Sequence, residues 1–233
     1  MSAFDAMRGG LVVSVQAPPG SPLREPAHMA AIAGAAELGG ARGIRADGAR
    51  DIAAIKAGVT LPVIGLHKRH TGDTVLITPE LDDALALAVA GADAVAVDAT
   101  TRPRADGRSA GQFLAELGRE LSLPVLADVD SFEAGVGARA AGAAAVATTL
   151  AGYTGGPVPA GPDVALVERL AAELDCPVIA EGRYATPAHV RSAFEAGAFA
   201  VVVGTAISDP TTLTRRLASA SPVAGHPEHV ATR

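Results

Sequence analysis

The sequence predicts an α/β protein made of a single (β/α)8 barrel, also called a TIM barrel, and three observations lead to this fold class. Four segments begin with Gly-Ala and continue into an apolar run, at Gly40, Gly91, Gly142 and Gly197. Three other apolar runs begin with Pro-Val, at Pro62, Pro124 and Pro177. Glycine readily adopts the left-handed conformation that ends a helix, and proline cannot continue one. Both patterns therefore mark a helix-to-strand junction.

Regular spacing is the third observation. From Gly40 to Gly91 and from Gly91 to Gly142 the separation is 51 residues, and from Gly142 to Gly197 it is 55, with one Pro-Val segment inside each interval. About 25 residues per segment suits one strand followed by one helix. The apolar segment at residues 10–15 brings the expected number of strands to eight. A doubly wound open sheet is the structural alternative.

Alanine-rich stretches between these segments are expected to be helices. Ser131, Thr186-Pro and Asp209-Pro are typical helix starts, because the side-chain oxygen caps the first turn and proline is tolerated there. The expected helices cover residues 28–38, 49–57, 79–90, 111–121, 132–141, 163–174, 186–196 and 211–220. We expect residues 1–221 to form one catalytic barrel domain and residues 222–233 to form a flexible C-terminal tail.

The composition argues against several classes of protein. Hydrophobic residues make up 49% of the chain but aromatic ones only 3%, so alanine, valine, leucine and isoleucine must build the core. A net charge of −6 argues against a nucleic-acid partner and an anionic membrane surface. The N-terminus lacks an apolar signal segment, and no apolar run reaches the roughly 18 residues of a membrane-spanning helix. We expect a soluble cytoplasmic protein.

Polar side chains stand where the expected strands end. In a barrel, these ends meet at one mouth, which is where barrel enzymes build their sites. Any one of these side chains could simply hydrogen-bond to water or to a neighbouring residue at the mouth. The whole set brings acids and cations together, and this favours a functional site. The set comprises Gln16, Arg45, Lys68, Asp98, Asp128, Thr148, Thr149, Glu181, Gly204 and Thr205.

Lys68 is the residue that we expect to do chemistry. It follows a short apolar run, and apolar walls together with the positive charge of Arg45 would lower its pKa, as a base or a Schiff-base nucleophile requires. An ion pair with Asp128 or Glu181 is the structural alternative. Two carboxylates near a lysine suit proton transfer at a carbon next to a carbonyl group.

Phosphate binding is indicated by Gly182-Arg183 and Gly204-Thr205, which follow the seventh and eighth expected strands. Glycine lets backbone N–H groups approach an anion, and these two loops are the usual phosphate position in such barrels. The six histidines are scattered and no nucleotide-binding glycine motif follows a strand, so we expect no metal and no cofactor.

Several segments, in order from about Gly10 to Leu217, resemble the bacterial N-acetylmannosamine-6-phosphate 2-epimerase family. They are residues 10–16, 40–46, 61–69, 77–79, 148–154, 161–163, 179–183 and 201–204. The resemblance implies a (β/α)8 barrel that interconverts N-acetylmannosamine 6-phosphate and N-acetylglucosamine 6-phosphate during sialic-acid breakdown, without a metal or nucleotide.

The resemblance also implies roles for particular residues. Lys68 corresponds to the catalytic lysine that moves the proton at C2, and Glu181 to the acid across the sugar. The residues that correspond to substrate-binding positions are Gln16, Arg45, Asp128 and Thr149, and those of the phosphate loops are Gly182, Arg183, Gly204 and Thr205. The chain departs from the family at Asp209, where an arginine is common.

Two other functions stay open at this point. Lys68 suits a Schiff-base aldolase or lyase acting on a sugar phosphate, and Asp209 is compatible with a phosphosugar-binding barrel that has no turnover. We expect a small amino sugar phosphate as ligand, no nucleic-acid or membrane partner, and a homo-oligomer, namely a dimer.

Overall fold

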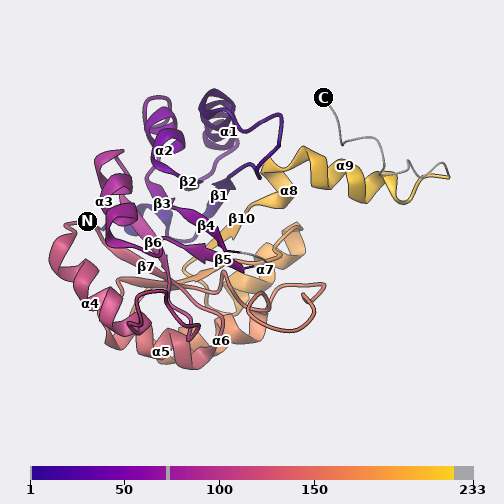
Figure 1. The fold of residues 1–233 in the computed structure, drawn as a ribbon. Helices are drawn as coiled ribbons and strands as arrows, with labels where there is room; N and C mark the ends of the chain where they lie inside the picture. Colours follow the sequence, from indigo (N-terminus) through magenta and orange to yellow (C-terminus); the bar gives the residue numbers. More distant parts are fainter. Residues whose placement is uncertain (1, 72–73, 223–233) are drawn as a thin grey trace.

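The computed structural model describes residues 2–71 and 74–222, and eight parallel strands of this part close into a barrel (Figure 1). Around the barrel the strands follow the order β1, β10, β9, β8, β7, β6, β3, β2. They are β1 (Leu11–Val15), β2 (Gly43–Asp47), β3 (Val63–Leu66), β6 (Ala94–Asp98), β7 (Val125–Asp128), β8 (Ala145–Ala147), β9 (Val178–Ala180) and β10 (Ala200–Val203). The predicted (β/α)8 barrel is confirmed, and the doubly wound alternative is wrong.

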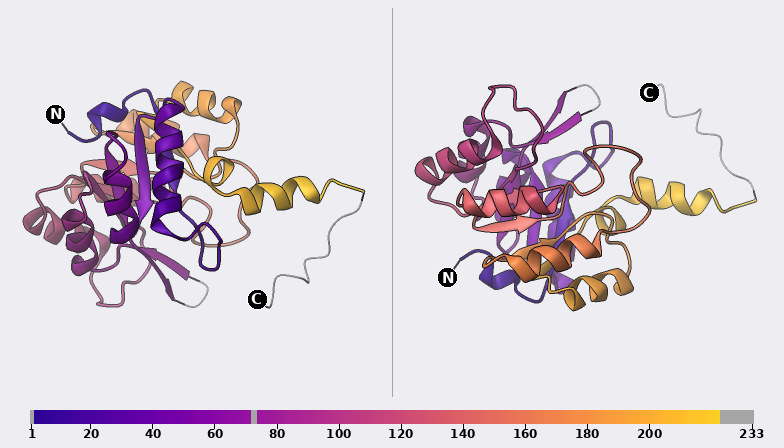
Figure 2. Two further views of the ribbon diagram at one scale, coloured as in Figure 1. Left: turned by 90° about the horizontal axis from the view of Figure 1, so that it is seen from above. Right: turned by 90° about the horizontal axis from the view of Figure 1, so that it is seen from below.

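Helices follow the barrel strands and cover the outer face of the barrel (Figure 2). They are α1 (Pro26–Leu38), α2 (Ala49–Lys56), α3 (Leu81–Val89), α4 (Ala110–Glu120), α5 (Phe132–Ala140), α6 (Val164–Glu173) and α7 (Pro187–Glu195). The expected caps form, since Ser131 accepts from the N–H of Ala134 and Thr186 accepts from the N–H of His189. These seven helices lie within a few residues of the predicted ranges.

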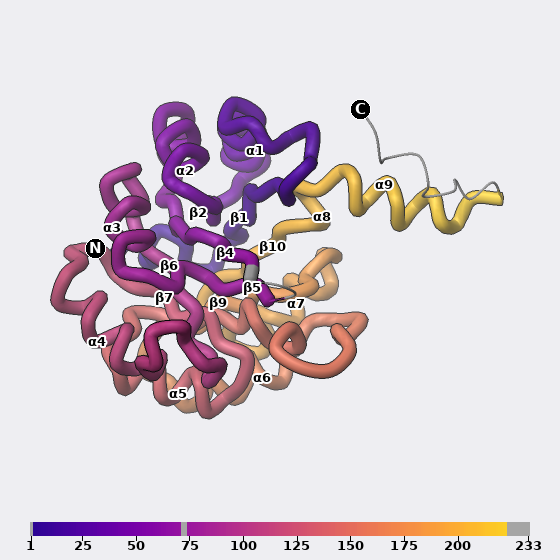
Figure 3. Tube along the Cα trace, viewed as in Figure 1, coloured from indigo at the N-terminus to yellow at the C-terminus, as the bar shows by residue number. Residues whose placement is uncertain are grey.

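The C-terminal end of the fold differs from the repeating pattern. A short helix, α8 (Thr205–Ser208), follows β10 and leads into α9 (Pro210–Ala218). Helix α9 points away from the barrel instead of lying on it, which the chain trace shows clearly (Figure 3). No residue of α9 is buried. The sequence predicted this helix but not its direction.

Aliphatic side chains fill the inside of the barrel, both alanines and larger ones such as Ile64, Leu126 and Ile179. Alanines such as Ala96 and Ala147 occupy inward positions, while the valines and isoleucines of the outer face pack under the helices. A single 3-10 turn, η1 (Asp5–Met7), closes the N-terminal end of the barrel, with Phe4 and Met7 fully buried. The opposite end, where the strands finish, stays available for polar groups.

A β-hairpin, made of β4 (Lys68–Thr71) and β5 (Thr74–Ile77), is inserted after β3, and the sequence analysis did not predict it. Its base is fixed by Thr78, which is fully buried and has a φ of +48°. The hydroxyl of Thr78 donates to the carbonyl of Ala96 at 2.6 Å and accepts from the N–H of His67 at 3.0 Å. Lys68, the first residue of β4, is therefore held between the hairpin and the barrel.

Among the described residues, no helix is both long enough and apolar enough to cross a membrane. The predicted flexible tail falls almost entirely at residues 223–233, which lie outside the described residues.

Candidate active site

Four of the predicted residues meet at the C-terminal end of the barrel, where Arg45 of β2 contacts three partners. Its two terminal nitrogens donate to Asp128 at 2.9 and 2.5 Å, and Nη1 also donates to Glu181 at 2.8 Å and to Thr149 at 3.4 Å. The hydroxyl of Thr149 donates to Asp128 at 2.5 Å. Because side chains alternate along a strand, the apolar Ala46 faces outward and Arg45 faces the mouth.

Arg45 is a buried cation held by two acids. Only 1% of its surface is exposed, and its Nε has no hydrogen-bond partner among the described residues. Burial disfavours its charge, but the attraction of Asp128 and Glu181 is stronger, so the pKa of Arg45 is raised. Both carboxylates therefore pair with Arg45, and the alternative in which Lys68 pairs with one of them is wrong.

Lys68 stands beside this cluster without a partner for its amine. Its backbone N–H donates to Asp47 at 2.9 Å, whereas its Nζ makes no hydrogen bond or ion pair with a described residue. Burial and then the positive charge of Arg45 lower the pKa of Lys68, against the opposing effect of Asp47 and the two acids. A lowered pKa enlarges the neutral fraction of the amine, which is the form that accepts a proton.

Glu181 follows β9, and its pKa is raised, whereas that of Lys68 is lowered. Burial and then the negative charge of Asp128 raise its pKa, although Arg45 and Lys68 oppose this rise. Its main chain is fixed by Thr148, whose hydroxyl donates to the Glu181 carbonyl at 2.9 Å and accepts from the Glu181 N–H at 3.0 Å. Arg45 neutralises Asp128, so one proton shared between Lys68 and Glu181 leaves the whole cluster neutral.

The predicted phosphate loops lie beside this cluster at the ends of β9 and β10. Gly182 has a φ of +104°, and a Cβ at Gly204 would lie 3.2 Å from the Cβ of Ser14, so both positions favour glycine. Within the described chain, no hydrogen bond uses the N–H of Gly182, Gly204 or Thr205. Three backbone donors are thus available to an anion at this place.

Arg183 has a further structural task. Its Nε donates to the carbonyl of Gly161 and its Nη1 to that of Ala151, both at 2.6 Å, so it holds the loop after β8. Its guanidinium also lies 5.1 Å from the ring centre of Tyr153. The role of Arg183 in phosphate binding stays a prediction, with only Nη2 not engaged by the loop.

The other predicted polar strand ends have different surroundings. Asp98 accepts from the hydroxyl of Thr100 at 2.7 Å and pairs with Arg102, so it belongs to the loop after β6 and not to the Arg45 cluster. Gln16 donates to Ser14 at 2.7 Å, while its buried Oε1 lacks a partner among the described residues and is available to a ligand. Asp209 caps α9 through the N–H of Thr212 at 3.0 Å.

Sequence reasoning missed three residues that position the site. Asp47, which holds the main chain of Lys68, could have been found from its alternation with Arg45. Thr78 gave a weaker signal as the residue before a proline. Arg102 gave no signal in the sequence. It donates to the backbone carbonyl of Val75 at 3.2 Å, and Val75 lies in the hairpin that was not predicted.

Metal ligation finds no support in residues 2–71 and 74–222, where no group of three or more histidine, cysteine or acidic side chains is placed to hold an ion. The mouth therefore contains the Arg45 cation paired with two carboxyl groups, those of Asp128 and Glu181, and the Lys68 amine with its lowered pKa.

Comparison with known proteins identifies the family. The family model described as "Putative N-acetylmannosamine-6-phosphate epimerase" matches residues 29–222. The chain belongs to this epimerase family. A protein of Cutibacterium acnes described as a "Putative N-acetylmannosamine-6-phosphate 2-epimerase" is 50% identical over 213 residues, covering 90% of this chain and 92% of its own. A relative from Caldanaerobacter subterraneus with the same description is 46% identical, with 93% and 92% covered.

Solved structures agree with the epimerase family. The N-acetylmannosamine-6-phosphate 2-epimerase of Clostridium perfringens superposes with a TM-score of 0.88 at 35% identity, covering 94% of this chain and 96% of its own. A geranylgeranylglyceryl phosphate synthase of Thermoplasma acidophilum, at 20% identity and a TM-score of 0.61, shares the fold alone. The resemblance found in the sequence motifs is confirmed, as is the expectation of an enzyme of the epimerase family.

Proposed function

We propose that the chain interconverts N-acetylmannosamine 6-phosphate and N-acetylglucosamine 6-phosphate, with Lys68 moving the proton at C2. The observation that carries the proposal is the partly buried Lys68, whose amine has a lowered pKa and no ion-pair partner beside two acids held by Arg45. Membership of the epimerase family supports the substrate. The proposed setting is amino sugar and sialic-acid breakdown in the cytoplasm.

The chemistry requires a base near C2. In the open-chain sugar, C1 is an aldehyde, so the neighbouring C2 proton is acidified and its removal leaves an enolate with negative charge on O1. The neutral amine of Lys68 takes this proton and becomes an ammonium. Return of a proton to the other face of C2 inverts the configuration, and atoms and charge balance without any other reactant.

Arg45 is proposed to stabilise the negative charge of the enolate. A positive guanidinium at a fixed position stabilises developing charge in a site from which water is excluded. Glu181, with its raised pKa, can hold the proton that Lys68 lacks, so it is proposed as the acid for the opposite face. Asp128, Thr149 and Gln16 are proposed to bind the hydroxyl and acetamide groups.

The phosphate is proposed to lie against the loops after β9 and β10. The unengaged N–H groups of Gly182, Gly204 and Thr205 support this placement, with the Arg183 Nη2 as a further donor. Binding the phosphate there would orient C2 toward the centre of the mouth, because the loops and Lys68 belong to the same end of the barrel.

Isotope exchange tests the proposal directly. In D₂O, the wild type should place deuterium at C2 of N-acetylmannosamine 6-phosphate, and Lys68→Ala should lose about 10²- to 10⁴-fold of the exchange rate. Lys56 is the only other lysine of the chain and lies on α2, so Lys56→Ala is the matched control and should keep the exchange. Absence of exchange in the folded wild type would refute the proposal.

A Schiff-base lyase is the second candidate, favoured by the same lowered pKa, since a neutral amine is also a nucleophile. Borohydride reduction in the presence of the substrate separates the two. Stable attachment of the sugar to a peptide containing Lys68 would select the lyase, and C2 exchange without attachment would select proton transfer. Ligand binding with neither outcome would select the non-catalytic barrel.

The expected homodimer belongs to the same proposal. Helix α9 projects from the barrel with no buried residue, and its Leu217 is 75% exposed. A helix this short gains most of its stability from packing of its apolar face, which supports a partner copy of the chain. A light-scattering mass near twice 23.2 kDa would support the dimer, and a mass of one chain would exclude it.

A further inference from the structure

Asp130 lies between β7 and α5, and no role has been given to its carboxyl group so far. Its Oδ1 is shielded from water and accepts no hydrogen bond from a described residue. Arg45 does not pair with it, because the ion pairs of Arg45 go to Asp128 and Glu181. Buried polar atoms are nearly always hydrogen-bonded, so an unpaired carboxyl oxygen beside a binding site needs an explanation.

Alternation along the chain shows which way Asp130 points. Leu126 belongs to the core inside the barrel, whereas Val129 is fully buried in the core under the helices. The ladder continues beyond the end of β7, since the N–H of Val129 donates to the carbonyl of Ala147 at 2.8 Å. Successive side chains of an extended segment point to opposite sides. Asp130 therefore lies on the inner side, as Asp128 does, and two residues nearer to the opening of the mouth.

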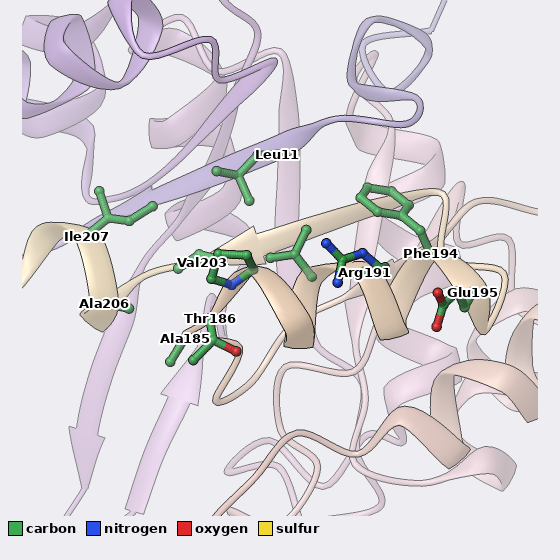
Figure 4. Close-up of a pocket in the computed structure, with 11 residues that line it drawn as sticks. Leu11, Ala185, Thr186, Arg191, Phe194, Glu195, Val203, Ala206 and Ile207 are labelled. Atoms are coloured by element: carbon green, nitrogen blue, oxygen red, sulfur yellow. The ribbon is translucent and has the colours of Figure 1, made fainter.

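The chemistry of Asp130 restricts what can pair with it. An ionised carboxylate only accepts hydrogen bonds, so its partner must be a donor, and the hydroxyl groups of a sugar are donors. The groove on the outer face beside α7 offers no such match, because apolar side chains such as Leu11 and Phe194 form most of its lining (Figure 4). The mouth is thus the place where a free acceptor and a polar ligand meet.

We propose that Asp130 accepts a hydrogen bond from the sugar hydroxyl at C3 or C4 and so contributes to substrate specificity. This inference rests on the proposed function. With C2 at Lys68 and the phosphate at the loops after β9 and β10, the hydroxyl groups between them face the remaining wall of the mouth, which includes the segment after β7. Rotation about the Cβ–Cγ bond of Asp130 brings either oxygen to the hydroxyl. A bond that is equally strong in the bound substrate and the transition state acts on KM and not on kcat.

Removal of the carboxyl group tests this role. Asp130→Ala should raise KM for N-acetylmannosamine 6-phosphate about 10- to 100-fold with little change in kcat, which is the usual strength of a hydrogen bond to a charged group. Asp130→Asn, whose amide oxygen can still accept, should lose less. An unchanged KM in Asp130→Ala would overturn the proposal.

The matched control is Glu133→Gln. Glu133 is an exposed acid in the first turn of α5, so this variant removes a charge from the same helix N-terminus without changing the mouth. Its KM should match that of the wild type. An equal rise of KM in Glu133→Gln and Asp130→Ala would show that Asp130 acts only through α5, and this would overturn the proposal.

Deoxy analogues identify the hydroxyl that Asp130 binds. The 3-deoxy and 4-deoxy forms of the substrate each lack one hydroxyl, and the wild type should bind one of them about 10- to 100-fold more weakly than the parent sugar. Asp130→Ala should bind that analogue and the parent almost equally, because the donor and the acceptor belong to one bond. If Asp130→Ala discriminates against both analogues as the wild type does, the proposal is overturned.

Calorimetry separates this proposal from the proposed function. In a Lys68→Ala background, the affinities for the parent sugar and the analogues are measured without turnover. Weaker binding of the parent after the added Asp130→Ala change supports the proposal, and unchanged binding overturns it. Absence of C2 exchange in the wild type, by contrast, counts against the proposed function and leaves the binding result for Asp130 in place.

Discussion

Arg45 and Lys68 are both basic residues of the same mouth, but their surroundings give them different tasks. Arg45 lies between two carboxyl groups and keeps its charge, whereas Lys68 has no carboxylate at its amine and is pushed toward the neutral form. Guanidinium suits the first task because it donates to both acids at once and does not lose its proton. An amine suits the second task because burial lowers its pKa.

Asp47 provides a test of this electrostatic balance. Its negative charge raises the pKa of Lys68, so Asp47→Asn should lower that pKa further. The acid limb of kcat/KM, where protonation of Lys68 stops the reaction, should then move to lower pH. The asparagine oxygen can still accept from the Lys68 N–H, so the main chain should keep its position.

The control is Asp93→Asn. Asp93 directly precedes β6 and contacts the first residue of β3, at the end of the barrel opposite to the mouth. Asp93 accepts from the N–H of Val63 at 2.8 Å, as Asp47 does from Lys68, but it lies away from the mouth. Its pH profile should match the wild type. A shift of the Asp47→Asn limb to higher pH would show that Lys68 is not the titrating base.

The β4–β5 hairpin is the element that positions Lys68, because the lysine is its first residue. Thr78 fixes its base, and Arg102 connects the carbonyl of Val75 on β5 with Asp98 at the end of β6. The hairpin is thus fastened to the barrel at two points. Catalysis by a single amine depends on this, since a displacement of about 1 Å is enough to slow a reaction strongly.

Arg102→Ala should therefore lower kcat by about 10-fold or more while changing KM little, because Arg102 positions the hairpin without belonging to the Arg45 cluster or the phosphate loops. Steady-state kinetics of epimerisation measures both constants. Arg108→Ala is the control, since Arg108 lies on the same loop but pairs with Asp106 and Glu116. An equal loss of kcat in the two variants would contradict a specific role for the hairpin contact.

For the whole molecule, Arg45 joins parts of the barrel that are distant in sequence. It bonds from β2 to Asp128 on β7 and to Glu181 after β9, across the mouth. Removing the cation leaves two acids in a site that excludes water, which typically costs about 3–5 kcal/mol. Arg45→Met should lower the unfolding free energy at pH 7 by about this amount in urea denaturation.

The pH dependence of this variant has a definite sign. Without Arg45, the pKa of Glu181 rises further above its unfolded value. A folded-state pKa above the unfolded one gives a contribution that is present below the unfolded pKa and is lost as pH rises. Arg45→Met should therefore lose less stability at pH 5 than at pH 7. Arg139→Met, which breaks a surface pair with Asp175, should show little change at either pH.

The sequence by itself determined the barrel, because Gly-Ala and Pro-Val junctions repeat at the length of one strand and one helix. It also located Lys68, Arg45, Asp128 and Glu181 at strand ends, since parallel strands of a barrel finish at one mouth. These conclusions rest on local patterns and on the repeating symmetry of the fold, and both can be recognised in a single sequence.

Only the tertiary structure decided how these side chains pair and where α9 lies. Pairing of Arg45 with both acids depends on distances between β2, β7 and β9, and nothing in the local sequence distinguishes it from pairing with Lys68. Helix α9 is joined to α8 by the single residue Asp209 and has no buried residue, and its helical pattern does not specify its direction. Periodicity specifies which face of an element is apolar, and contacts between distant elements specify what covers it.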